Sequence, residues 1–197
     1  MFKIGITGGI GSGKTTVCKV FELLGIPVFY ADDVAKELMV KDAILIQQIK
    51  AIFGEEAYFA NQVLNRKYIS DQVFKQPNQL KKLNNIVHPA VFKAFDVWNN
   101  QQKAPYVLKE AALLFESGSY LQNDYNILVS CPLALRITRV MQRDQVTKEK
   151  VMERVAAQLP EETKQSLANY QIQNNEQEFI ITQVLHLHSQ LLQKALK

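Results

Sequence analysis

The feature that most constrains this chain is a glycine-rich loop close to its N-terminus. Residues 8–15 read GGIGSGKT and match the pattern GxxxxGK[ST] at every fixed position. The apolar alternation of residues 2–7 predicts a short buried strand, and residues 14–24 repeat apolar side chains at helical spacing. A strand, this loop and a helix in that order predict an α/β fold with a parallel sheet.

The composition of the loop suits the binding of phosphate groups. Gly9, Gly11 and Gly13 permit backbone angles that turn successive N–H groups inward, and the following helix adds the positive end of its dipole. The ammonium of Lys14 is expected to reach the β- and γ-phosphates of a nucleotide, and the hydroxyl of Thr15 is a candidate Mg²⁺ ligand. The alternative is a chance glycine turn, which the full pattern between a strand and a helix disfavours.

Other nucleotide-binding classes fit the sequence less well. A dinucleotide-binding fold needs GxGxxG, but the sixth position is Lys14 when counted from Gly9 and Thr16 when counted from Gly11. The sequence contains no NKxD motif of the kind that reads guanine in GTPases. The predicted third strand ends at Glu110, without the aspartate that motor and helicase ATPases usually place there. A small-molecule kinase is the favoured interpretation.

The rest of the chain predicts alternating strands and helices. Further strands are expected at 27–30, at 126–130 and at 170–173, and another begins with residues 106–108. Together with residues 2–7 this gives five strands. Residues 32–100 are expected to be mostly helical. Three more helical segments are expected: 132–143 with Ser130 as a possible N-cap, about 147–164 as one charged segment, and a tail from about 177 with Phe179 near its apolar face.

Composition narrows the class of protein. The 197 residues are 47% hydrophobic, enough for one domain, or a core domain with a modest insertion, without disulfides. The net charge of +4 suits anionic small molecules and does not by itself indicate nucleic acid. Cys18 and Cys131 have no metal-ligand spacing and are expected to be reduced thiols. No apolar run reaches the ~18–20 residues of a membrane span and no signal peptide is predicted, so a cytoplasmic location is expected. A monomer is also expected, with weak oligomerisation as the alternative.

Several segments together resemble the dephospho-coenzyme A kinase family. In chain order they are GITGGIGSGKTT, LGIPVFYADDVAKEL, the dipeptide His88-Pro89, ALLFESG, RITRVMQRD, ERVAAQLP and ANYQIQNN. The loop alone is common to many kinases, whereas the combination in this order and spacing is specific and covers essentially the whole chain. The resemblance implies an α/β P-loop fold in which helices sandwich a five-stranded parallel sheet, with a helical insertion and a helical lid.

The resemblance also implies a reaction. ATP would give its γ-phosphoryl group to the ribose 3′-hydroxyl of dephospho-CoA, the final step of coenzyme A synthesis, with Mg²⁺ as a cofactor. The implied catalytic residues are Lys14, Asp32 and Arg139. The carboxylate of Asp32 would accept the hydroxyl proton or orient the hydroxyl. The alternatives are that Asp32 is a helix N-cap, or that Asp33 takes its place.

Further contacts follow from the same resemblance. ATP would be bound by Gly9, Gly11, Ser12, Gly13, Lys14, Thr15, Thr16, Arg139, Arg143 and Asn174. The acceptor would be bound by Asp32, His88 and Arg154, the last as a lid arginine. Arg139 and Arg143 share a helix face, for which a solvated basic face is the alternative. His88 could instead be a structural residue that caps a turn before Pro89.

The expected organisation is a nucleotide-binding core at 1–31 and 101–197, with a lid at about 144–166, and an acceptor-binding helical insertion at 32–100. This sequence departs from the family's pattern at Tyr30, Glu110, Ala112 and Asn169, and Tyr30 cannot replace the charge of the aspartate that usually stands there. Two other functions stay open: a kinase for nucleoside monophosphates, and a regulatory protein that binds ATP and has no acceptor.

Overall fold

The computed structural model describes residues 1–195, without the side chains of residues 74, 75 and 77. The chain forms two compact units, one made of Met1–Tyr30 and Gln102–Lys197 and the other of Ala31–Gln101. Among the described residues, no helix combines the length and the apolar character needed to cross a membrane.

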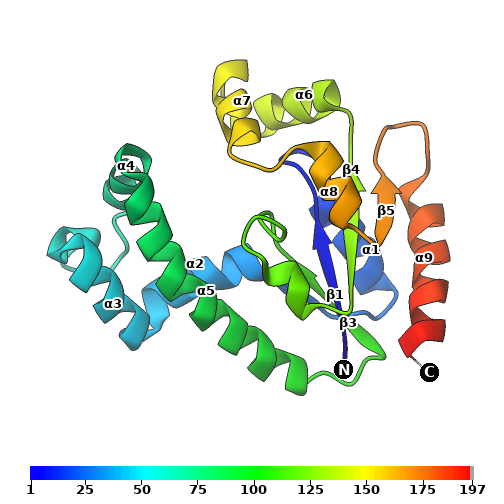
Figure 1. The fold of residues 1–197 in the computed structure, drawn as a ribbon, viewed down its shortest axis with the longest axis horizontal. Helices are drawn as coiled ribbons and strands as arrows, with labels where there is room; N and C mark the ends of the chain where they lie inside the picture. The colour runs from blue at the N-terminus through cyan, green and yellow to red at the C-terminus, as the bar shows by residue number, and fades with distance from the viewer. Residues whose placement is uncertain (196–197) are drawn as a thin grey trace. The chain divides into compact units, whose positions relative to one another are not determined.

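The first unit contains the sheet (Figure 1). Its strands are β1 (Phe2–Thr7), β2 (Val28–Tyr30), β3 (Tyr106–Glu110), β4 (Tyr125–Ser130) and β5 (Tyr170–Gln173). Its helices are α1 (Lys14–Leu23), the 3-10 helix η2 (Ser119–Gln122), α6 (Leu133–Asp144), α7 (Lys148–Ala156), α8 (Glu161–Leu167) and α9 (Ile180–Ala195). The five expected strands are confirmed, because local apolar patterning and the glycine loop mark them in the sequence.

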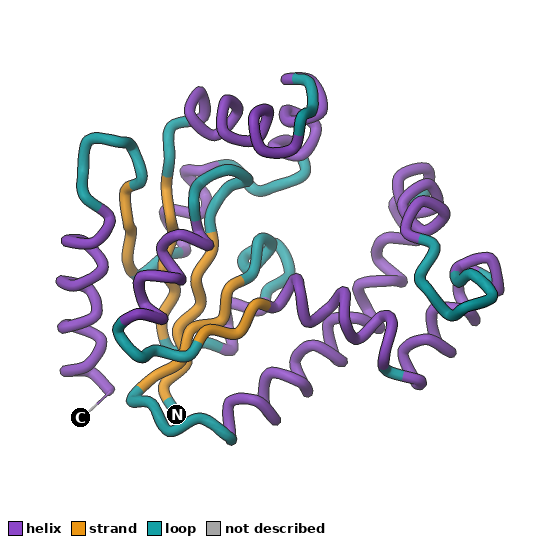
Figure 2. The backbone as a smooth tube through the Cα atoms, turned by 180° about the vertical axis from the view of Figure 1, so that it is seen from behind, coloured by secondary structure: helices purple, strands orange, loops and turns teal. Residues whose placement is uncertain are grey.

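All strand pairs in the sheet are parallel, in the order β2-β3-β1-β4-β5. Figure 2 shows the strands side by side in orange. The glycine-rich loop follows the central strand β1, whose two neighbours β3 and β4 come later in the chain. The loop therefore lies where the strand order reverses, at the carboxyl ends of the strands, which is where open α/β sheets bind ligands.

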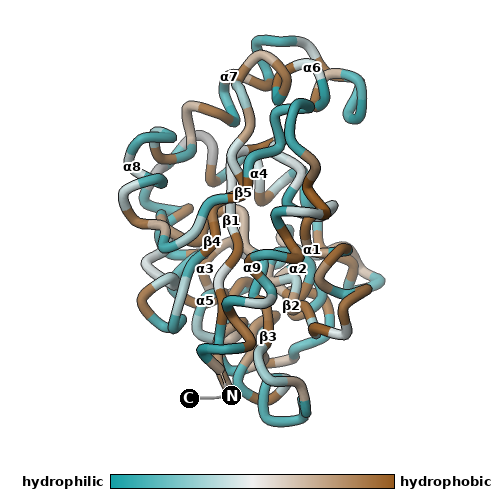
Figure 3. Tube along the Cα trace, turned by 90° about the vertical axis from the view of Figure 1, so that its right-hand side faces the viewer, coloured by the Kyte–Doolittle hydropathy of each residue, from teal (hydrophilic) through white to brown (hydrophobic). Residues whose placement is uncertain are grey.

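Successive side chains along each strand point to opposite faces of the sheet, and different segments pack on the two faces. One face carries Ile4 and Ile6 of β1, which join a fully buried cluster with Val17 and Phe21 of α1 and Leu191 of α9. In Figure 3 the tube carries brown, apolar stretches along the central strands. Helices α1 and α9 pack against each other over this face. This face of the sheet is thus packed against α1, the helix whose N-terminus follows the loop.

The other face of the sheet is covered by different segments. A Cβ added at Gly5 of β1 would touch Leu114, which lies in the segment after β3 and is fully buried. Leu128 of β4 and Val107 of β3 are also fully buried, and α8 packs against β4. Burial on both faces explains the continuous apolar runs of these strands.

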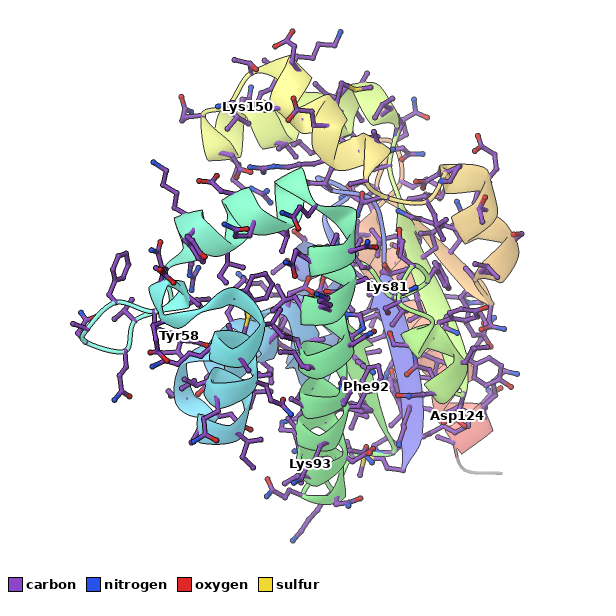
Figure 4. The ribbon with its side chains drawn as sticks, turned by 60° about the vertical axis from the view of Figure 1, so that its left-hand side comes forward. Tyr58, Lys81, Phe92, Lys93, Asp124 and Lys150 are labelled. Atoms are coloured by element: carbon purple, nitrogen blue, oxygen red, sulfur yellow. The ribbon has the colours of Figure 1, made fainter. Side chains whose placement is uncertain are left out.

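The second unit is helical. Its elements are α2 (Ala31–Lys41), α3 (Ala43–Phe53), η1 (Glu55–Ala57), α4 (Arg66–Lys75) and α5 (Pro77–Asn100), and α5 contacts α2, α3 and α4. Asp42 caps α3 by accepting hydrogen bonds from the N–H groups of Ile44 and Leu45. The hydroxyl of Tyr58 donates to the carbonyl of Met39 at 2.7 Å. Tyr58 is labelled in Figure 4 together with Phe92 and Lys93 of α5.

Three local predictions are wrong. Ser130 is not the N-cap of the following helix, because α6 begins at Leu133 and the cap position is Pro132. The segment 147–164 is not one helix, because α7 ends at Ala156 and Pro160 cannot continue it. Phe179 lies before the first residue of α9 and is 82% exposed, so it does not join the apolar face of that helix.

Candidate functional site

The glycine-rich loop has the backbone geometry of an anion-binding nest. Gly11 and Gly13 have φ angles of 77° and 91°, which favour glycine, and Gly13 is the N-cap residue of α1. Within residues 1–195 no side chain caps this helix end, so its first N–H groups face the loop. The hydroxyl of Ser12 is buried and finds no hydrogen-bond partner among the described residues. These features fit a phosphate group as the missing acceptor.

The side chain of Lys14 links the end of the loop to its beginning. Its Nζ donates to the carbonyl oxygen of Gly8 at 3.0 Å and lies 4.0 Å from the carboxylate of Glu110 at the end of β3. Both side chains are about nine-tenths buried. The ammonium is therefore held at the end of the central strands, in position to meet an anion in the nest.

Asn174 supports the loop from the segment after β5. Its side-chain N–H donates to the carbonyl oxygen of Ser12 at 2.8 Å, and a Cβ at Gly13 would overlap its amide group. Arg139 of α6 is 3.4 Å from the Oδ1 of Asn174 and pairs with Glu176 at 2.9 Å. The structure thus brings two of the sequence-predicted residues, Arg139 and Asn174, to the side of the loop formed by Ser12 and Gly13.

Arg136 is a residue that sequence reasoning missed. It lies on the first turn of α6, its side chain is 8% exposed, and its guanidinium stands where a Cβ of Gly9 would lie. It lies 3.8 Å from the carboxylate of Glu161, and its Nε has no hydrogen-bond partner among the described residues. The signal in the sequence is position: Arg136 opens the RITRVMQRD segment, one helical turn before Arg139.

Arg143 and Arg154 lie together at the junction of α6 and α7. Both pair with Asp144, at 2.7 Å each, and Arg143 is 63% exposed. Hydrogen bonds from Arg143 and then Arg154 lower the pKa of Asp144 to about 2. In this structure Arg143 and Arg139 therefore share a helix but contact different carboxylates.

The connector between α7 and α8, residues 157–160, lies against the loop. The Oε1 of Gln158 accepts a hydrogen bond from the Ile10 N–H at 2.9 Å. The neighbouring Leu159 N–H donates to the carboxylate of Glu116 at 2.9 Å, and Lys164 pairs with the same carboxylate at 3.4 Å. A cavity of about 340 Å³ is lined by Arg136, the end of α7, residues 158–160 of this connector and the start of α8.

The predicted acceptor residues Asp32 and His88 belong to the second unit. Asp32 is an exposed residue in the first turn of α2, two residues past the end of β2. The N-cap alternative for Asp32 is wrong, because α2 already begins at Ala31. Asp33 pairs with Lys36 at 2.7 Å.

His88 does not cap a turn, because α5 continues through Pro89 as a helix of 24 residues. Its ring instead lies 6.1 Å from that of Phe92, one turn further along α5. The proline removes one hydrogen bond from the interior of the helix without ending it.

Two further residues, Cys18 and Tyr30, have raised pKa values. Burial raises the pKa of the Cys18 thiol, and both Cys18 and Cys131 are buried free thiols. Burial also raises the pKa of Tyr30, whose hydroxyl donates to Glu22 of α1 at 3.1 Å. Tyr30 is thus neutral at physiological pH and binds α1, so it supplies no charge at the end of β2.

The structure offers no preformed protein cage for a metal ion. Within residues 1–195 no cluster of three His, Cys, Asp or Glu side chains could hold one. Side-chain oxygens near the loop include the hydroxyl of exposed Thr15 and the carboxylate of Glu110, which lies 4.0 Å from Lys14. This set fits Mg²⁺, which binds through one or two protein oxygens and keeps other ligands from water and phosphate.

Comparisons with known proteins agree with one another. A family model described as dephospho-CoA kinase matches residues 2–179. A dephospho-CoA kinase of Chlorobium chlorochromatii is 39% identical over 98% of this chain and 95% of its own length, and one of Salinibacter ruber is 41% identical over 89% of each. The crystal structure of TT1252 from Thermus thermophilus superposes with a TM-score of 0.86 at 33% identity, over 96% of both chains.

Proposed function

This chain belongs to the dephospho-CoA kinase family, and we propose that it transfers the γ-phosphoryl group of ATP to the ribose 3′-hydroxyl of dephospho-CoA. The observation that carries the proposal is the loop itself, an uncapped helix end with Lys14 held beside it and arginines on α6 nearby. Phosphoryl transfer proceeds through a loose transition state, so catalysis rests on positioning and charge neutralisation.

The residues of the loop would hold the phosphates of ATP. Gly9, Gly11, Ser12, Gly13, Thr15 and Thr16 would line them, with Lys14 at the β- and γ-phosphates. When bound, Mg²⁺ would neutralise phosphate charge, and the Thr15 hydroxyl would be its protein ligand. The uncapped end of α1 and the buried hydroxyl of Ser12 support this assignment.

Arginines would neutralise the charge that spreads over the transferred group. Arg139 is proposed as the catalytic arginine and as an ATP contact, and Asn174, 3.4 Å from it, is proposed to bind ATP as well. Arg143 is proposed to contact ATP and Arg154 the acceptor, within a lid at about 144–166 that excludes water when it closes. Arg136 is added to this set, because its buried guanidinium lies against Gly9.

The second unit would supply the acceptor side. Asp32 is proposed to accept the proton of the 3′-hydroxyl or to orient it, and His88 to contact dephospho-CoA. The position of Asp32 directly after β2, in the first turn of α2, supports the proposal, because carboxyl ends of parallel strands carry ligand sites. The chain is further proposed to act as a monomer in the cytoplasm.

A coupled ADP-release assay tests the function. Mg·ATP is supplied alone and with dephospho-CoA, CoA, AMP or CMP. ADP release that requires dephospho-CoA, with a product that comigrates with CoA, supports the proposal. Stimulation by a nucleoside monophosphate instead would assign a different acceptor, and ATP binding without stimulation by any acceptor would indicate a regulatory protein.

A further inference from the structure

The carboxamide of Gln158 joins three segments that are far apart in the sequence. Its Oε1 accepts from the N–H of Ile10 at 2.9 Å, and its Nε2 donates to the carbonyl oxygen of Ala112 at 3.4 Å. Ile10 is in the glycine-rich loop, Ala112 follows β3, and Gln158 lies between α7 and α8. Only one orientation of the amide satisfies both partners, since a flipped amide would place N–H against N–H.

The position of Gln158 is fixed from outside the loop. The backbone N–H of the next residue, Leu159, donates to Glu116 at 2.9 Å, and Lys164 pairs with the same carboxylate while only 1% of its side chain is exposed. Glu116 and Ala112 lie in the same segment after β3. The glutamine is therefore held on a buried anchor, and its amide reaches from that anchor to the loop.

The loop needs such a contact because its own backbone is permissive. Ile10 stands between Gly9 and Gly11, and glycine, having no Cβ, can adopt many backbone conformations besides the positive φ angles seen at Gly11 and Gly13. The nest binds phosphate only when successive peptide planes point their N–H groups inward. A hydrogen bond that fixes the peptide N–H of Ile10 restricts the rotation of that plane and of its glycine neighbours.

We propose that Gln158 is a positioning residue that holds the loop in its nucleotide-binding conformation before ATP arrives. The proposal rests on the proposed use of ATP, but Gln158 acts through the Ile10 peptide and not by touching ATP. Apparent affinity falls in proportion to the fraction of molecules that are binding-competent, so a loosened loop weakens ATP binding. Once ATP is bound and the loop is ordered, turnover changes little.

Glutamine is the side chain that the two partners require. Leucine has a similar volume and can neither accept from Ile10 nor donate to Ala112. Glutamate accepts from Ile10, cannot donate to Ala112, and adds a negative charge beside the predicted phosphate site. Gln158→Leu removes both hydrogen bonds. Gln158→Glu keeps the bond from Ile10, loses the bond to Ala112 and adds a negative charge. Gln193→Leu, on the exposed surface of α9 and outside the proposed lid, is a matched control.

Two readouts test the proposal. Amide hydrogen exchange is followed in the peptide that covers residues 8–14 of the nucleotide-free protein, and Kd and KM for ATP are measured beside kcat and the KM for dephospho-CoA. Gln158→Leu is expected to speed exchange in this peptide and to raise Kd and KM for ATP about fivefold, the ratio for one net hydrogen bond. The kcat and the KM for dephospho-CoA should change less than about twofold. Gln158→Glu should weaken ATP binding more than Gln158→Leu, and Gln193→Leu should change neither readout.

Unchanged exchange and unchanged ATP affinity in folded Gln158→Leu would overturn the proposal. A parallel fall in kcat, in both affinities and in thermal stability would also overturn it, because it would mark a general structural role. If Gln158→Leu does not fold, Gln158→Asn, whose shorter side chain cannot reach both partners, takes its place. Exchange and ATP binding need no acceptor, so they decide this inference even if the wild-type protein fails to phosphorylate dephospho-CoA.

Discussion

The ammonium of Lys164 lies 3.4 Å from the carboxylate of Glu116, and only 1% of the lysine side chain is exposed. This pair fixes the start of α8 to the segment after β3. A charge buried to this extent is tolerated because a partner of opposite charge stands beside it, and removing one partner leaves the other uncompensated.

Lys164→Met should therefore lower the free energy of unfolding by about 3 kcal/mol, the lower end of the range for a broken buried pair, since Glu116 is 16% exposed. Urea denaturation measures it. The control is Lys150→Met, because Lys150 is an exposed residue of α7 (Figure 4) and its loss should cost less than about 0.5 kcal/mol. Equal stabilities of the two variants would contradict the importance of this ion pair.

Gly9→Ala should be costly because of Arg136. The added Cβ would overlap the buried guanidinium, so either the loop or the arginine must move, at about 1–3 kcal/mol of unfolding free energy. The same substitution made together with Arg136→Ala should cost at least about 1 kcal/mol less, since the obstacle is gone. A double-mutant cycle by urea denaturation measures the difference, and identical costs in both backgrounds would show that the two residues do not touch.

The stability of the protein should fall in mild acid because of His188. The Nδ1 of this residue lies 2.6 Å from the hydroxyl of the fully buried Tyr106, and burial lowers the pKa of His188. As pH falls below about 6.5 the unfolded chain takes up a proton that folded His188 resists, so the free energy of unfolding decreases until the pH is below the folded pKa.

Urea denaturation at about pH 8 and about pH 5.5 measures this slope. His188→Gln should flatten it, because the glutamine side chain does not titrate. A slope that survives in His188→Gln would assign the pH dependence to another group.

Lys14→Ala should lower turnover about 100-fold or more, because the ammonium at the end of the loop neutralises charge on the transferred phosphoryl group. The fold should persist, as judged by circular dichroism. Lys19→Ala, on the exposed side of α1, is the matched control and should keep wild-type rates in the ADP-release assay. Wild-type turnover by Lys14→Ala would exclude the loop as the site of phosphoryl transfer.

Asp32→Asn should lower kcat about 100-fold or more and leave ATP affinity within about twofold, since the carboxylate is proposed to act on the acceptor hydroxyl. Asp33→Asn is the matched control, because Asp33 is already paired with Lys36 in the same turn. Steady-state kinetics with both substrates separate the two effects. The opposite ranking of the two variants would move the role to Asp33, and weakened ATP binding in Asp32→Asn would make Asp32 a nucleotide-side residue.

The five strands and the loop could be predicted because their signals are local. Period-two apolar patterns and a complete motif each occupy fewer than ten consecutive residues, as in GGIGSGKT at residues 8–15. Pro160 is a local signal that α7 and α8 are separate helices. The charged residues around it recur at helical spacing, however, and this pattern predicts one continuous helix. Pro89 shows the opposite case, in which α5 keeps its helical hydrogen bonds around a proline.

The role of Arg136 could not be predicted from spacing. Arg136, Arg139 and Arg143 recur along α6 at intervals that place all three near one face. Burial and pairing distinguish them: Arg136 lies against the loop, Arg139 reaches Asn174 and Glu176, and Arg143 contacts its neighbour Asp144. These differences depend on segments far along the chain, which no local pattern of α6 contains.

The strand order also has a consequence for synthesis on the ribosome. The partners of β1 are β3 and β4, and the whole of Ala31–Gln101 is made before either of them. The helical unit is continuous in sequence, so its internal contacts can form before β3 is made, whereas β1 has neither of its strand partners until residues 106–110 and 125–128 have been made. The glycine-rich loop is therefore made long before Gln158 and Asn174, the side chains that hold it, have been added to the chain.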